Sequence, residues 1–197
     1  MKQMKTKARL FALCLGLLML AAFAGSVLVV FADADVKAFG DGGHNAQSVP
    51  EGKGVVGMHI GVNGEFSAFS FVMPTWTVSG EYSAYLSVYR WDTDYDTTVA
   101  AEPILKQTFE DFEDNSTLSM DFGSVDEKAF GAGTYLLVAK DGIDTQGTGV
   151  GVWTGPRWQG DDAEFYSSYD FVGYANGRVN KKNIMKATLM VYGYHAE

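Results

Sequence analysis

The sequence predicts an all-β protein: an antiparallel β-sandwich of the jelly-roll type, preceded by an N-terminal signal peptide or anchor helix. Three observations support this fold class. Beyond residue 54 the chain consists of short runs in which apolar and polar residues alternate, as in strands with one buried face. Most runs end at Gly, Asp or Asn, and the chain has 23 glycines, which suits many tight turns. No long stretch carries apolar residues at helical spacing, and roughly eight to ten short strands indicate a sandwich or a barrel.

Residues 1–32 have the layout of a secretory signal. A basic start is followed by an uncharged, mostly apolar run from Leu10 to Ala32. The run ends in Val30-Phe31-Ala32, which fits a cleavage site, and Ala22-Phe23-Ala24 is a second candidate. An uncharged run of roughly 20 residues also suffices to span a bilayer, so an uncleaved signal anchor is the alternative. Both interpretations export the remaining chain and predict a secreted or cell-surface protein.

Composition excludes several function classes. The single cysteine, Cys14, lies in the apolar run, so the exported part has no disulfide, thiol nucleophile or cysteine zinc site. Four basic and no acidic residues fall in residues 1–32, which leaves 11 basic against 24 acidic residues, a net charge of −13. Phosphate binding depends on clustered Lys and Arg, so no nucleic acid is expected as a partner. A membrane is expected as a partner only if the N-terminal segment stays uncleaved.

The exported part divides into a linker and one domain. Residues 33–53 are interpreted as a linker, because they are rich in Gly, Asp and small polar residues without a sustained period. The β-sandwich domain is expected over residues 54–197, and Asn63-Gly64 between its first two runs is a two-residue hairpin signal. The expected strands cover residues 55–62, 65–73, 75–79, 82–91, 104–112, 116–123, 132–140, 150–154 and 185–195.

Alternation within the 82–91 strand predicts which side chains enter the core. Ala84, Leu86 and Val88 share one face, because side chains alternate along a strand. The opposite face carries serines and the aromatic residues Tyr85, Tyr89 and Trp91. A tyrosine-rich face that sees solvent is a candidate binding surface, and cover by loops is the alternative.

The acidic stretch Asp92-Thr93-Asp94-Tyr95-Asp96 follows that strand. Carboxylates at every second position begin an EF-hand loop, but the template needs Gly and Glu where this chain has Thr97 and Pro103. We therefore interpret Asp92 and Asp94 as residues that cap a turn through backbone N–H groups. A looser structural calcium site is the less favoured alternative, and no metal or other cofactor is predicted.

Catalytic motifs are not found. The chain has neither G-x-S-x-G nor H-E-x-x-H, and His44, His59 and His195 have no metal-binding spacing. Glycoside hydrolysis needs two carboxylates on either side of one bond, and no pair can be selected among 24 acidic residues. The sequence therefore predicts a non-catalytic protein.

Four tryptophans lie in the β domain and are candidates for stacking on sugar rings. Arg157 and Trp158 lie in a polar loop punctuated by Gly and Pro, which favours exposure. Trp76 and Trp153 are flanked by strand residues and are expected in the core. Trp91 ends a strand on its tyrosine-rich side, and both locations remain open for it.

The stretch from Tyr89 to Tyr95, with Thr98-Val99, Pro103-Ile104, the Phe109–Asn115 turn, Ala132–Leu136 and Val150–Trp153, forms a recognisable pattern. Over roughly residues 65 to 155 the chain resembles β-sandwich modules of the galactose-binding-like or carbohydrate-binding type in secreted bacterial carbohydrate-active proteins. Residues beyond 155 align only loosely with that pattern. The resemblance implies a glycan or polysaccharide partner.

We therefore expect an exported, non-catalytic carbohydrate-binding module that binds glycans through exposed aromatic residues. The expected ligand-binding residues are Tyr85, Tyr89, Trp91, Asp92, Asp94, Tyr95, Arg157 and Trp158. A cell-surface interaction or structural protein without a sugar ligand is the alternative, and a small jelly-roll glycan hydrolase or lyase is a weaker one.

Overall fold

The computed structural model describes residues 35–39, 45–62, 65–76, 82–121, 131–144, 149–156 and 170–192. They all belong to one compact unit, Asp33–Glu197. The expected signal or anchor with its candidate cleavage sites lies outside the described residues, as do Arg157 and Trp158. No helix in the described part of the chain is long and apolar enough to cross a membrane.

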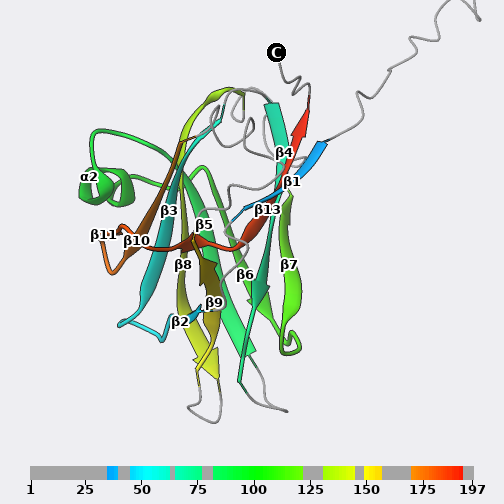
Figure 1. Ribbon diagram of the computed structural model, residues 1–197. Coiled ribbons are helices and arrows are strands. Elements are labelled where there is room, and N and C mark those ends of the chain that lie inside the picture. The colour runs from blue at the N-terminus through cyan, green and yellow to red at the C-terminus, as the bar shows by residue number, and fades with distance from the viewer. Residues whose placement is uncertain are drawn as a thin grey trace, which may run out of the picture. The chain divides into compact units, whose positions relative to one another are not determined.

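The unit is all-β, as the sequence predicts, and its strands form three antiparallel sheets (Figure 1). The sheet orders are β11-β10-β3-β8-β5-β6, β1-β13-β4-β7 and β12-β9-β2. In the first sheet the strands are, in that order, Arg178–Asn180, Asp170–Ala175, Val55–Val62, Gly133–Asp144, Tyr82–Arg90 and Leu105–Glu110. In the second they are Asp35–Phe39, Ala187–Tyr192, Glu65–Met73 and Ser116–Asp121. In the third they are Ile184–Met185, Gly151–Gly155 and Asn45–Ser48.

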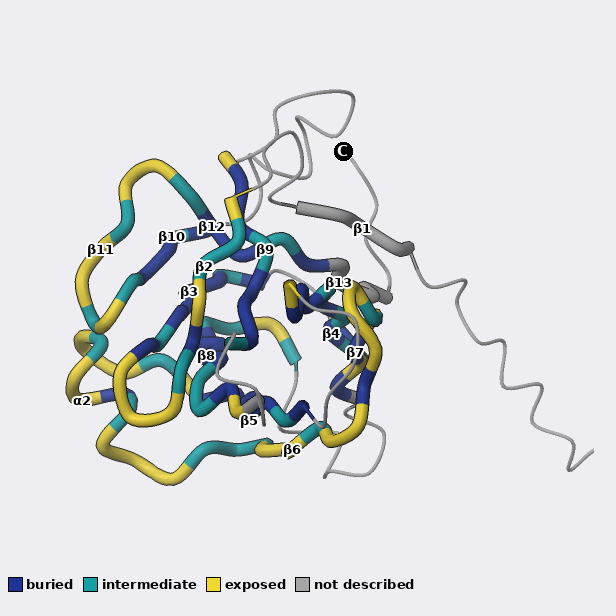
Figure 2. The backbone as a smooth tube through the Cα atoms, turned by 90° about the horizontal axis from the view of Figure 1, so that it is seen from below, coloured by how far each residue is buried: buried dark blue, intermediate teal, exposed yellow. Residues whose placement is uncertain are grey.

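One hydrophobic core receives side chains from all three sheets. Ala84, Leu86 and Val88 of β5 are buried in it, which confirms the face predicted by alternation. Phe69 of β4 and Val152 of β9 belong to the same cluster from the other two sheets. Figure 2 shows buried positions along the strands that surround this core. Each fully buried large side chain stabilises the fold by about 1.5–3 kcal/mol, so the core is the main source of stability.

The hairpin predicted at Asn63-Gly64 is wrong, although β3 and β4 have the predicted bounds. β3 pairs with β10 and β8, whereas β4 pairs with β13 and β7 in another sheet. Ile60 of β3 and Phe69 of β4 both enter the shared core, so the two strands contribute to it from different sheets. An Asn-Gly hairpin does form at Asn176-Gly177, between β10 and β11. Both residues have positive φ, 49° and 75°, as a type I′ turn requires.

Residues 33–53, interpreted as a linker, contain two strands. β1 pairs with β13, and β2 pairs with β9. Both strands lie at the edge of their sheets and are four or five residues long, which is too short for alternation to be recognised. The folded unit therefore begins earlier than residue 54.

A strand is expected at 75–79, but Thr75 and Trp76, the first two residues of that range, lie outside any strand. Trp76 is also not a core residue: its side chain is 46% exposed. Its φ of 56° is incompatible with an extended strand, which explains why the strand pattern failed here.

Candidate functional site

The stretch after β5 folds into a short helix, α2 (Tyr95–Ala100). Asp94 is its N-cap, and the Asp94 Oδ1 atom accepts a hydrogen bond from the backbone N–H of Thr97 at 2.8 Å. This hydrogen bond is the largest cause that lowers the pKa of the Asp94 carboxyl. The Thr98 hydroxyl donates to the Asp94 carbonyl at 2.6 Å and accepts from the Asp92 N–H at 3.0 Å. Asp92 Oδ1 accepts from the N–H of Thr93 at 2.7 Å.

These hydrogen bonds confirm the interpretation of Asp92 and Asp94 as capping residues. Asp, unlike Ala, satisfies a free N–H group at a helix start, so the acidic stretch is a local folding signal. Among the residues that the structure describes, no group of three or more His, Cys, Asp or Glu side chains is arranged to hold a metal ion.

Helix α2 covers part of the tyrosine-rich face of the six-stranded sheet, beside β3 and β10 (Figure 1). The Tyr95 ring lies 5.0 Å from the Tyr174 ring and rests above Gly57, where an added Cβ would be 3.2 Å from the Tyr95 Cε2 atom. Tyr89 beneath the helix is buried. The absence of a side chain at Gly57 is therefore what lets Tyr95 approach the sheet.

Trp91 is half-buried at the same place. Its ring centroid is 4.2 Å from that of His59 and 6.0 Å from that of Tyr174. Tyr85, farther along β5, is also half-buried, and the Lys140 Nζ atom lies 5.1 Å from the centre of its ring. The aromatic face predicted on β5 is thus neither fully open nor fully covered.

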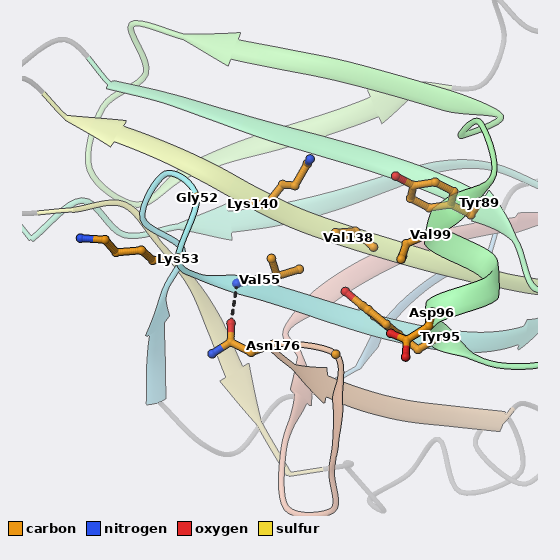
Figure 3. Close-up of a pocket in the computed structure, with 11 residues that line it drawn as sticks. Gly52, Lys53, Val55, Tyr89, Tyr95, Asp96, Val99, Val138, Lys140 and Asn176 are labelled. Carbon is orange, nitrogen blue, oxygen red and sulfur yellow. Dashed lines mark hydrogen bonds between the residues drawn. The ribbon is translucent and has the colours of Figure 1, made fainter.

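A pocket of about 470 Å³ lies where α2 and two turns meet this face of the sheet (Figure 3). The sheet contributes Val55, Tyr89, Val138 and Lys140 to its lining. The helix contributes Tyr95, Asp96 and Val99, and the turns contribute Gly52, Lys53, Asn176 and Gly177. The lining therefore combines two aromatic rings, an apolar floor and several hydrogen-bonding groups.

Hydrogen bonds hold the two turns in place. The Asn176 Oδ1 atom accepts from the backbone N–H of Val55 at 2.9 Å, and the Asn176 N–H donates to the Val55 carbonyl at 2.8 Å. On the other turn, the N–H of Gly52 donates to Asp141 Oδ1 at 3.2 Å. These contacts use the protein's own groups, so both turns that line the pocket are held by hydrogen bonds within the protein.

The polar groups of the pocket are suited to hydrogen bonding with a neutral ligand. Burial is the main cause that raises the pKa of the Tyr95 phenol, with smaller contributions from Tyr89, Asp96 and Tyr174. Tyr95 is therefore a hydrogen-bond donor at neutral pH. The Lys140 ammonium is balanced by Asp141, whose Oδ2 atom is 3.3 Å away. Asp96 is the only carboxylate among the described residues that line the pocket.

The expected ligand-binding residues are only partly brought together. Tyr89 and Tyr95 line the pocket, and Tyr85 adjoins it through Lys140. Trp91 packs against His59 and Tyr174, whereas Asp92 and Asp94 are engaged in local hydrogen bonds. Arg157 and Trp158 lie outside the described residues.

Sequence reasoning missed the lining contributed by the two turns, including Lys53 and Asn176. The Asn176-Gly177 pair was a usable hairpin signal, but nothing local in the sequence indicates that this hairpin packs against β3. No protein-family model, curated protein or solved structure matches the chain.

Proposed function

We propose that this chain is an exported, non-catalytic carbohydrate-binding protein and that the pocket beside α2 holds a saccharide unit. The pocket carries the proposal, because it places the rings of Tyr89 and Tyr95 beside Asp96, Lys140 and Asn176. Its volume of 470 Å³ falls in the range of about 300–1,000 Å³ that is usual for small-ligand sites.

The chemistry of a sugar matches this lining. A pyranose presents C–H groups that pack on aromatic rings and hydroxyl groups that both donate and accept hydrogen bonds. Tyr95 donates at neutral pH, Asp96 accepts, and the Asn176 amide nitrogen donates while its oxygen is held by Val55. The chain's excess of acidic residues disfavours phosphorylated ligands, which supports a ligand without phosphate.

The proposed fold is a β-sandwich, in keeping with the resemblance to carbohydrate-binding modules. Its support is the shared core, which receives side chains from the six-stranded sheet and from the four- and three-stranded sheets. In such a sandwich the pocket lies on the outer face of one layer, where α2 and the turns surround it.

A binding role is favoured over glycan cleavage at this pocket. Two-carboxylate glycoside hydrolysis needs a general acid together with a base or nucleophile. Asp96 has no second carboxylate beside it among the described lining residues. The lining therefore favours recognition of a sugar over two-carboxylate cleavage of its glycosidic bond.

Glycan-array binding of the full chain tests the proposal, followed by calorimetry with the best-bound oligosaccharide. Tyr95→Phe removes one hydrogen bond to the ligand, and Asp96→Asn weakens one because the acceptor loses its charge, so each is expected to weaken binding by about 5- to 10-fold. Asp111→Asn is the matched control, because Asp111 is exposed and does not line the pocket. No binding on any array, or equal affinity for all variants, contradicts the proposal.

A further inference from the structure

A second aromatic surface lies on the three-stranded sheet, on its face turned away from the core. Val150 and Val152 are in the core cluster, so the alternate positions Gly151 and Trp153 face away from it. On the six-stranded sheet, the pocket residues Tyr89 and Val138 likewise alternate with core residues and face outward. The two surfaces therefore lie on different sheets, each on the face turned away from the core.

Trp76 lies across this second surface. Its side chain is 46% exposed, although it is among the largest apolar side chains in the protein. The ring is seated on Gly151: an added Cβ there would collide with Trp76 Cη2 and lie 2.9 Å from Cζ3. The positive φ of Trp76, 56°, is unfavourable for a bulky residue. The chain therefore holds an exposed indole in a fixed position at a conformational cost.

Hydrogen bonds connect the Trp76 segment to Trp153. Asp114 Oδ1 accepts from the Thr75 backbone N–H at 2.7 Å and from the Thr75 hydroxyl at 3.3 Å. The Asn115 amide nitrogen donates to Asp114 Oδ2 at 2.9 Å, and the Trp153 indole N–H donates to Asn115 Oδ1 at 2.8 Å. The network holds the Trp153 indole and the Thr75 backbone next to Trp76 before any ligand arrives, which lowers the entropy cost of binding.

We propose that Trp76 and Trp153 form a second saccharide site, a stacking platform for one sugar ring of a polysaccharide. The saccharide class rests on the proposed function, whereas the platform itself rests on the residues just described. With the pocket, the platform gives one chain two glycan sites and hence avidity for a polymer.

The size of the apolar patch favours a sugar ring over a protein partner. The other large apolar side chains exposed in the described part of the chain, Ile143 and Val179, belong to β8 and β11 rather than to this surface. A stable protein interface buries about 800 Å² per partner. One exposed indole bordered by Asp114 and Asn115 is much smaller and matches the mixed C–H and hydroxyl surface of a pyranose.

Affinity electrophoresis of the full chain tests this site, in native gels that contain dextran, xylan, laminarin or hydroxyethylcellulose. In a gel that retards the wild type, Trp76→Ala is expected to bind at least about 10-fold more weakly. Trp76→Phe keeps a smaller ring and is expected to retain part of the retardation. Far-UV circular dichroism and thermal melts of both variants establish that they fold.

The outcomes separate the two sites. If Trp76→Ala migrates like the wild type while Asp96→Asn loses retardation, the platform is overturned and the pocket stands. If Trp76→Ala loses retardation while Asp96→Asn keeps it, the platform stands and the pocket falls. If none of the four gels retards the wild type, the platform is overturned as a polysaccharide site, and the oligosaccharide array alone decides the pocket.

Discussion

Asn176 lies in the turn of the β10–β11 hairpin, which forms one side of the pocket, and it joins this turn to β3. It has a left-handed backbone, with φ of 49°, and its side chain accepts a hydrogen bond from the Val55 N–H at 2.9 Å. Replacing it with Ala removes the hydrogen bond and leaves a residue that disfavours this φ. Replacing it with Gly removes the same hydrogen bond but tolerates the backbone conformation.

The magnitudes follow from these two contributions. Loss of the hydrogen bond costs about 1 kcal/mol in the free energy of unfolding. The left-handed conformation costs an Ala residue about 1 kcal/mol more. Asn176→Ala is therefore expected to destabilise by about 2 kcal/mol and Asn176→Gly by about 1 kcal/mol. For a unit of this size, each kcal/mol lowers the melting temperature by about 2–4 °C, so the Ala variant should melt about 4–8 °C lower.

Thermal melts followed by circular dichroism measure these differences. Val179→Ala is the control on the same hairpin, since its side chain is 54% exposed and the change is expected to stay within about 0.5 kcal/mol. Equal destabilisation by Ala and Gly at position 176 would refute the contribution of the left-handed backbone. An unchanged melting temperature for both would refute the importance of the hydrogen bond to Val55.

Three further predictions concern stability. Phe69→Ala, in the core, is expected to lower the free energy of unfolding by about 3–5 kcal/mol in chemical denaturation. Ile143→Ala, at an exposed position, should lower it by under about 0.5 kcal/mol. Similar losses for the two variants would contradict the assigned core. Asp94→Ala should melt at a lower temperature at pH 7, because the N-cap is lost. Since folding lowers the Asp94 pKa below 3.8, its contribution is present above that pH and is lost as the pH falls through the folded-state pKa. The difference in melting temperature should therefore narrow on acidification, and a constant difference down to pH 2 argues against the N-cap. Melts in excess EDTA and in millimolar calcium should coincide, whereas a shift of several degrees that Asp94→Ala abolishes would show a calcium site.

Local sequence was sufficient for the bounds of β3 and β4 and for the buried face of β5. Apolar and polar residues alternate along a strand that has one buried face, so the sequence correctly predicts Ala84, Leu86 and Val88 in the core. The local sequence does not determine which strands pair with each other. Asn63-Gly64 and Asn176-Gly177 are the same dipeptide, yet only the second joins paired strands. Which one forms a hairpin depends on which sheet each flanking strand completes.

The candidate site was predictable only in its aromatic part. Alternation along the β5 strand predicts Tyr89 as a site residue, and the acidic stretch that starts α2 predicts Tyr95. Asn176 reaches the pocket through a contact with Val55, 121 residues away in the sequence, and no periodicity reports such a contact. The sequence predicts Trp76 in the core because its neighbours resemble a strand, and the positive φ of Trp76 cannot be inferred from that pattern.

The most direct measurement of the central claim is a ¹H–¹⁵N correlation spectrum of the protein, titrated with the oligosaccharide that binds best on the array. We expect the backbone amide signals of Gly52, Val55, Asp96 and Gly177 to shift together and saturate with one dissociation constant, because these residues line one pocket. Amides near Asp111 should not move with them. Saturating binding that leaves all four pocket signals unchanged would contradict the claim that the pocket beside α2 holds the sugar.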